Sequence, residues 1–268
     1  MIDWMKYRWL YLLISGTVII SGVFSIAKWG LPIGVDFKGG SVLEYKLPDG
    51  SSRIIKSGFV DQAKKEQIKT DLEKEVKGKV TELRYENVGP TAGSDLIKKT
   101  LYGLLVATFG ILLWVAIQFK SIKFGISAVL AMLHDTLVVI GMYSIFGHFF
   151  GAEVDLLFVT ALLTILSFSV HDTIIVYDRI RESKKGYSDN LYDLANKATS
   201  ETMVRSLNNT FVLVFMMVAL LLLGGVTIRW FVATLLVGSI SGAYSSPFVA
   251  VSILVTWDEI QKKFKFKK

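Results

Sequence analysis

Long apolar stretches separated by short polar segments make up most of the chain, and this pattern predicts six membrane-spanning helices. A bilayer core about 30 Å thick requires roughly 20 apolar residues in each helix that crosses it. We expect the spans at Trp9–Ala27, Leu101–Gln118, Ile126–Phe146, Leu156–Tyr177, Leu207–Val226 and Phe231–Trp257. The predicted fold class is therefore an α-helical polytopic membrane protein.

The first span has a competing interpretation as a cleavable signal peptide. Ser25-Ile26-Ala27 matches the small-x-small spacing of a cleavage site weakly. The apolar run before it is longer than the usual hydrophobic region of about 7–15 residues. We therefore expect this span to be retained as an anchor.

A polar segment, residues 28–100, separates the first two spans, and its pattern predicts a small α+β domain. Ser41–Leu47 alternates in polarity, which is typical of a strand, and Pro48-Asp49-Gly50 is a turn signal. Val60–Val76 spaces its apolar residues along one helix face. Val80–Asn87 is predicted to form a second strand.

Half of the 30 lysines and arginines lie in four segments that flank the spans, and with six spans these segments lie on one side of the membrane. The positive-inside rule makes that side cytoplasmic, which places the 28–100 domain outside the cytoplasm. The predicted organisation is a cytoplasmic N-terminus and first span (1–27), the extracytoplasmic domain (28–100), spans two to six with a cytoplasmic loop at 178–206 (101–257), and a basic cytoplasmic tail (258–268).

The composition supports a membrane protein and excludes several classes of site. Hydrophobic residues make up 52% of the chain and charged residues 20%, with a mean hydropathy of +0.48, whereas soluble proteins carry about 25% charged residues. The absence of cysteine excludes a disulfide scaffold, a zinc-cysteine site and a thiol nucleophile. The net charge of +7 is explained by the segments that set the topology. We therefore expect no nucleic-acid partner.

Two spans contain ionisable residues, which cost about 2.5–3.5 kcal/mol each at the bilayer centre and are usually functional or paired. His134-Asp135 lies in the third span and His171-Asp172 in the fourth. Counting about 1.5 Å per residue from the span ends places Asp135 near the midplane and Asp172 in the cytoplasmic third. We therefore expect two separate sites at different depths.

Asp172 requires a partner, and Arg205 at the start of the fifth span is predicted to lie at a comparable depth. A carboxylate whose positive partner can approach or withdraw changes its proton affinity, as a proton carrier requires. His171, about 100° away around the helix, is a candidate proton relay. A polar pair that locks two helices together explains Asp172 equally well. His134 and Asp135 are also candidates for proton coupling, although a polar contact that joins helices is slightly favoured for them.

Two further segments carry signals for packing and for the membrane surface. Gly238 and Gly242 predict a close approach of helices in the sixth span, which Pro247 is predicted to kink. Apolar residues from Leu191 to Ala198 predict a short amphipathic helix within the 178–206 loop. The basic tail, with Phe264 and Phe266 among its lysines, predicts contact with anionic lipids.

Several strings of residues resemble the SecF family of protein-export membrane subunits, and the resemblance covers nearly the whole chain. They are Gly34-Val35-Asp36-Phe37-Lys38-Gly39-Gly40, Val88-Gly89-Pro90, His134-Asp135, the run 168–182 with Asp178, Arg179, Arg181 and Glu182, Arg205-Ser206, and Gly242-Ala243-Tyr244-Ser245-Ser246. The run 168–182 is the most specific of them. The chain departs from the family pattern at Phe168 and His171, where the family usually has Tyr and Asn.

The resemblance implies an accessory subunit of the Sec translocase that has no enzymatic activity and no bound cofactor or metal. It implies assembly with SecD beside the SecYEG channel in the prokaryotic inner membrane, and contact of the external domain with a translocating unfolded polypeptide. The proton-motive force would drive late steps of export, with Asp172 and Arg205 taking part in the coupled movement. That movement would reach the external domain through the first span and Gly39-Gly40.

Three other interpretations remain open at this stage. One half of an RND-type proton-coupled small-molecule transporter would have the same six spans. A membrane metalloenzyme could use His134, Asp135, His171 and Asp172 as ligands, although the predicted difference in depth argues against it. A structural assembly factor would need none of the buried charges.

Overall fold

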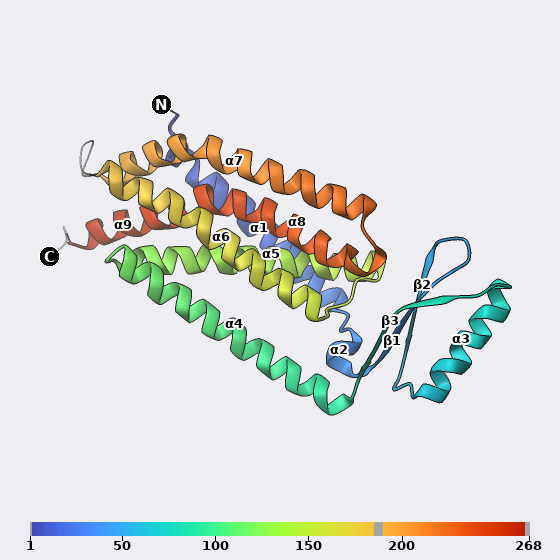
Figure 1. Ribbon diagram of the computed structural model, residues 1–268. Coiled ribbons are helices and arrows are strands. Elements are labelled where there is room, and N and C mark those ends of the chain that lie inside the picture. The colour runs from blue at the N-terminus through green and yellow to red at the C-terminus, as the bar shows by residue number, and fades with distance from the viewer. Residues whose placement is uncertain (1, 185–189, 266–268) are drawn as a thin grey trace. The chain divides into compact units, whose positions relative to one another are not determined.

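The computed structural model describes residues 2–184 and 190–265 and is mostly helical (Figure 1). Two compact units are present. The larger, helical unit contains Met1–Leu31, Leu104–Ala152 and Leu157–Lys268, and the smaller unit contains Pro32–Gly103 and Glu153–Leu156.

Among the described residues, six helical stretches are long and apolar enough to cross a membrane, which confirms the predicted fold class. The N-terminal stretch contains η1 and α1, and the C-terminal stretch contains η2, α8, η3 and α9. The elements that form these stretches are η1 (Trp4–Tyr7), α1 (Arg8–Trp29), α4 (Pro90–Gln118), α5 (Ile122–Phe150), α6 (Leu156–Ser183), α7 (Leu191–Leu223), η2 (Val226–Ile228), α8 (Arg229–Ser245), η3 (Ser246–Ala250) and α9 (Val251–Lys265).

Small residues set the close packing of α1 against α5. A Cβ atom added to Gly141 of α5 would lie 2.5 Å from the Gly22 Cα of α1, which leaves no room for any side chain at this crossing. One turn away, the Ser25 hydroxyl donates to Ser144 Oγ at 2.9 Å. Close approach combined with an interhelical hydrogen bond is a common way to join helices in a membrane, where lipid is as apolar as leucine.

The predicted cytoplasmic loop at 178–206 is largely helical instead. α6 continues to Ser183, and α7 begins at Leu191 and runs without interruption through the fifth span, so the predicted short amphipathic helix is the first part of a longer one. Its apolar residues pack into the bundle core, where Leu194 is buried against the end of α6. The polar side chains at these helix ends form ion pairs, such as that of Arg179 with Glu201. A hydropathy pattern does not detect such pairs.

Pro247 lies in a π-helical segment, η3, rather than at a simple kink. The segment joins α8 to α9 and spans Ser246–Ala250, all but one of whose residues are buried. Such π-bulges interrupt the regular hydrogen-bond ladder of a helix. The Ser246 hydroxyl donates to the backbone oxygen of Ser169 at 3.1 Å, so this segment is anchored to α6.

The smaller unit is a three-stranded antiparallel sheet with one longer helix. Its strands are β1 (Gly40–Lys46), β2 (Ser52–Ser57) and β3 (Thr81–Val88), in the order β2-β1-β3. α3 (Gln62–Val76) packs Leu72 against Leu43 and Tyr45 of β1. Both predicted strands and the predicted helix are present, whereas β2 and the short α2 (Val35–Lys38) were not predicted.

Candidate functional site

Asp135 of α5 lies inside the helical unit with none of its surface exposed. Three serine hydroxyls donate hydrogen bonds of 2.6 Å to its carboxylate, namely Ser169 of α6 and Ser241 and Ser245 of α8. His134 Nδ1 lies 3.1 Å from Oδ1. Because a carboxylate has about four acceptor positions, these contacts fill them. One side chain thus ties together three membrane-spanning helices.

The two ring nitrogens of His134 have different surroundings. Nδ1 faces Asp135, whereas Nε2 is buried and has no hydrogen-bond partner among the described residues. The ring lines a cavity of about 320 Å³ between α1, α5 and α8. A carboxylate next to Nδ1 favours the proton on that nitrogen in the neutral ring, which leaves Nε2 as an acceptor.

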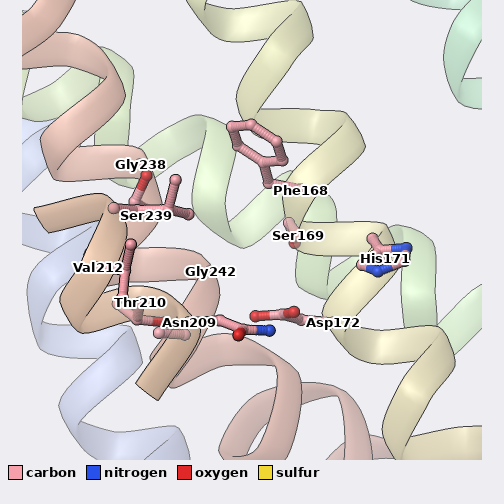
Figure 2. A pocket seen from close by; sticks show the side chains of 12 residues that line it. Phe168, Ser169, His171, Asp172, Asn209, Thr210, Val212, Gly238, Ser239 and Gly242 are labelled. Carbon is pink, nitrogen blue, oxygen red and sulfur yellow. The ribbon is translucent and has the colours of Figure 1, made fainter. Parts of the chain in front are cut away.

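Asp172 of α6 has a more open environment than Asp135. It is half-buried and lines a cavity of about 360 Å³ between α6, α7 and α8. The Ser206 hydroxyl of α7 donates to its carboxylate at 3.3 Å. Figure 2 shows the Asn209 side chain of α7 pointing toward this carboxylate. Asp172 therefore borders a cavity, and fewer hydrogen bonds hold its carboxylate than hold that of Asp135.

The two carboxylates are closer in depth than the sequence indicated. Ser169 contacts Asp135 directly, and Asp172 is three residues farther along the same helix, which corresponds to about 4.5 Å of helix rise. The expectation of two separate depths is corrected here. The helices continue beyond the apolar runs from which the depths were counted, so those counts began at the wrong points.

The predicted ion pair between Asp172 and Arg205 is not formed in the described part of the chain. Ser206, the next residue, faces Asp172 instead, and successive residues on a helix point about 100° apart. Arg205 is exposed and lines a different, more polar cavity of about 470 Å³ together with Asp178, Arg179 and Glu201.

Comparison with known proteins identifies the family. The sequence profile described as "Protein export membrane protein SecD/SecF, C-terminal" matches residues 67–260. The protein translocase subunit SecF of Thermobaculum terrenum is 36% identical to the chain, over 96% of this chain and 94% of the relative. The chain belongs to the SecF family. The SecF of Anaerolinea thermophila is 33% identical over 100% of this chain and 98% of its own length.

SecDF proteins, which are longer, provide a structural match for this SecF-family chain. The crystal structure of SecDF from Thermus thermophilus superimposes with a TM-score of 0.84 at 26% identity, covering 96% of this chain. The chain spans only 39% of that SecDF chain. The SecDF of Bacillus subtilis is 30% identical over 95% of this chain, which matches 38% of its length.

The glycine-rich motif that follows α1 in this SecF-family chain surrounds a buried carboxylate. Asp36 is buried, and its Oδ2 accepts the backbone N–H of Leu156, the first residue of α6, at 2.9 Å. A carboxylate at a helix N-terminus is favoured by the helix dipole. Gly39 and Gly40 both have positive φ, and a Cβ atom at Gly40 would lie 2.7 Å from the Ser57 carbonyl oxygen.

The remaining motif residues are spread over both units. In the smaller unit, Phe37 is buried, and Gly89 immediately precedes α4, whose first residue is Pro90. At the end of α6, Asp178 pairs with Arg181 at 2.7 Å, and Arg179 pairs with Glu182 at 3.0 Å and with Glu201 of α7. These four charged residues of α6 therefore form ion pairs at the end of the helix, whereas Ser169, earlier in the same motif, contacts Asp135.

The glycines of α8 lie where α6 approaches. A Cβ atom at Gly238 would fall 2.3 Å from the Ile165 side chain, and one at Gly242 would lie 3.6 Å from Ser169. Gly238 therefore leaves no room for a Cβ atom beside α6, whereas a Cβ at Gly242 would make ordinary van der Waals contact. No group of three or more histidine and acidic side chains suited to a metal ion occurs among the described residues.

Sequence reasoning missed the serine donors as a set. Ser241 and Ser245 are four residues apart and therefore share one face of α8. Ser169 is three residues before Asp172 on α6. Hydroxyl groups at helical spacing opposite a buried acid are the signal that could have identified Asp135 as the centre of a network.

Proposed function

We propose that this chain is an accessory subunit of a protein translocase. It assembles with a SecD partner beside the SecYEG channel and promotes late steps of polypeptide export across the prokaryotic cytoplasmic membrane, driven by the proton-motive force. The names of its relatives support the translocase assignment. The basic segments at the helix ends support an orientation with both termini in the cytoplasm. The chain contributes no enzymatic chemistry, holds no cofactor, and uses the proton gradient as its energy source.

The environment of Asp172 carries the proposal. Its carboxylate borders a cavity within the helix bundle and is held by one hydroxyl at 3.3 Å. One charge crossing the membrane field supplies about 2.3 kcal/mol per 100 mV. Protonation of Asp172 removes a negative charge next to Ser206 and Asn209, which loosens α6 from α7. Arg205, on the same segment of α7, approaches or withdraws as that contact changes.

Asp135 serves as the fixed point of this movement. A protonated carboxyl group would have to give up one of its four filled acceptor positions. The network therefore holds α5, α6 and α8 together while the α6–α7 contact changes. His134 and His171 supply imidazole groups that can relay protons.

The coupling to the smaller unit passes along α6. Asp36 holds the first residue of this helix, and Asp172 lies farther along the same helix. On protonation, α6 therefore moves relative to α7 as one body with α5 and α8, and this movement reaches the motif around Gly39 and Gly40 through Asp36. The smaller unit, which contacts the translocating polypeptide in this proposal, converts that shift into a change of conformation.

A polar stripe on α6 supports a membrane partner. Thr160, Ser167 and His171 are exposed on one side of this helix, within a stretch that spans the membrane. Exposed polar groups are costly against lipid and usually face another protein segment. The fused SecDF chains of other bacteria carry such a partner covalently, and we assign the stripe to contact with SecD.

The experiment is a test of export in vesicles that contain SecD and the channel. Asp172→Asn keeps the size and polarity of the side chain but cannot exchange a proton, and we expect it to abolish the proton-gradient-dependent part of export. Asp172→Glu should retain part of it. Asp71→Asn, at an exposed position of α3, is the matched control. Full gradient-dependent export by the Asp172→Asn variant, with SecD still bound, would refute the proposal.

A further inference from the structure

A basic pocket lies at the end of the helical unit that carries both termini, outside the network of buried carboxylates (Figure 1). Its volume is about 390 Å³. The charged residues that line it are Lys120, Lys123, Arg181, Lys184, Lys262 and Asp258. Five cations and one carboxylate thus surround a single cavity, and this excess of positive charge favours an anionic ligand.

The single acid does not neutralise the pocket. Lys123 and Lys262 share Asp258, at 2.9 and 2.8 Å. Lys120 and Lys184 are exposed, and neither forms an ion pair with a residue in the described part of the chain. Two ammonium groups at the rim are therefore available to an anion.

The third cationic group of the pocket is already oriented. Arg181 pairs with Asp178 at 2.7 Å, its guanidinium lies 5.4 Å from the ring centre of Phe119, and its Nη1 donates to the Gln118 carbonyl oxygen at 3.3 Å. An arginine held in this way loses little side-chain entropy when it binds an anion.

The backbone adds a second attraction for negative charge. Ser121, the N-cap of α5, lines the pocket, and its side chain does not cap the helix. The first N–H groups of this 29-residue helix therefore lie beside the cavity and are not capped by the Ser121 side chain. Helix N-termini favour anions such as phosphate through these N–H groups and the helix dipole.

Apolar side chains also line the pocket, and they favour a lipid, which has acyl chains, over a free phosphate. Phe119 and Phe124 stack with their ring centres 5.2 Å apart, and Leu191, Leu194 and Leu254 complete the lining. A phosphodiester with attached acyl chains satisfies both the cations and the wall. Basic pockets between membrane helices on the cytoplasmic side are known to bind such headgroups.

We propose that this pocket binds the headgroup of an anionic phospholipid, with Lys120 and Lys184 as mobile contacts and Arg181 and the α5 N-terminus as fixed ones. The site is independent of the proposed export function. It anchors the ends of α4, α5, α6, α7 and α9 at the membrane surface.

The test measures lipid retained by the purified full-length chain, using native mass spectrometry after reconstitution in nanodiscs. The bilayer contains phosphatidylglycerol mixed with phosphatidylcholine. The test variant is Lys120→Gln/Lys184→Gln. The matched control is Lys6→Gln/Lys263→Gln, which removes two exposed lysines from the same end of the protein, outside the pocket. We expect phosphatidylglycerol affinity to fall about fivefold per removed pocket lysine, roughly 25-fold for both, and to stay nearly unchanged in the control.

An equal loss of phosphatidylglycerol affinity in the two variants would show only diffuse electrostatic attraction and would overturn the proposed site. No loss of affinity in either variant would overturn it as well. A parallel arm adds inorganic phosphate at the concentration of the lipid. We expect it to leave the bound phosphatidylglycerol in place, because phosphate cannot fill the apolar wall. Displacement by inorganic phosphate would assign the site to a free anion and contradict the lipid. Circular dichroism checks that the variants retain their helices.

Discussion

The hydrogen bonds to Asp135 predict a sharp difference between two substitutions at this position. Asp135→Asn preserves four contacts, because its amide oxygen accepts from Ser241 and His134 while its NH₂ group donates to Ser169 and Ser245. Asp135→Ala removes every one of them. The first substitution removes only the charge, whereas the second removes the junction between three helices.

The magnitude follows from the number of bonds between helices. Three serine hydroxyls from α6 and α8 reach Asp135, and such bonds contribute about 0.6 kcal/mol on average and up to about 1.7 kcal/mol within membrane proteins. We expect Asp135→Ala to lower the free energy of unfolding by about 2 kcal/mol, or by about 5 kcal/mol at the upper limit. Asp135→Asn should lower it by less than about 1 kcal/mol.

The assay is reversible unfolding of the purified protein in mixed detergent micelles, followed by circular dichroism. A double variant with Ser241→Ala measures how much of the Asp135→Ala loss comes from one bond. If Asp135→Asn is as damaging as Asp135→Ala, the negative charge rather than the hydroxyl network holds the helices. If Asp135→Ala is harmless, the network contributes nothing to stability and the reasoning fails.

Two further predictions concern the packing and the N-terminus. Gly141→Ala drives a methyl group into the Gly22 backbone, and it should lower the free energy of unfolding by about 1–3 kcal/mol. Gly110→Ala is the control, because its Cβ would meet nothing within 4 Å. It should not lower the free energy of unfolding. An unchanged Gly141→Ala midpoint would contradict the packing of α1 on α5. The hydrogen bond from Tyr192 holds the pKa of Asp3 below its usual range. At a pH above the usual pKa of aspartate, this contact therefore stabilises the N-terminal segment. The stabilisation is lost as the pH falls through the lowered pKa. The amide protection factors of the N-terminal segment, corrected for the intrinsic pH dependence of exchange, should therefore fall in acid. Asp3→Asn should abolish that fall, and a fall that persists in Asp3→Asn would contradict the prediction.

The elements of the fold were largely predictable from sequence, because each depended on a local pattern. Apolar length identified the six spans, and alternation identified β1 and β3. β2 was not predicted because Ile54 and Ile55 are adjacent, so apolar and polar residues do not alternate along this strand. The helical ends of α6 and α7 were not predicted because they are held by contacts with other helices, namely the packing of Leu194 into the core and the ion pair of Arg179 with Glu201.

The site was less predictable than the fold. Sequence located the two buried acids, since a carboxylate in an apolar run is conspicuous. It could not assign their partners, which come from other helices and depend on rotation about each helix axis. A turn of about 100° separates Arg205 from Ser206, and this rotation decides which of them meets Asp172.

Asp172 is the carboxylate that gains and loses a proton in the proposed movement. Infrared difference spectroscopy across a pH jump tests this assignment directly, because a protonated carboxyl group has its own C=O stretching band. The account predicts a band that disappears in Asp172→Asn and persists in Asp135→Asn. A band that persists in Asp172→Asn and is lost in Asp135→Asn would contradict the account.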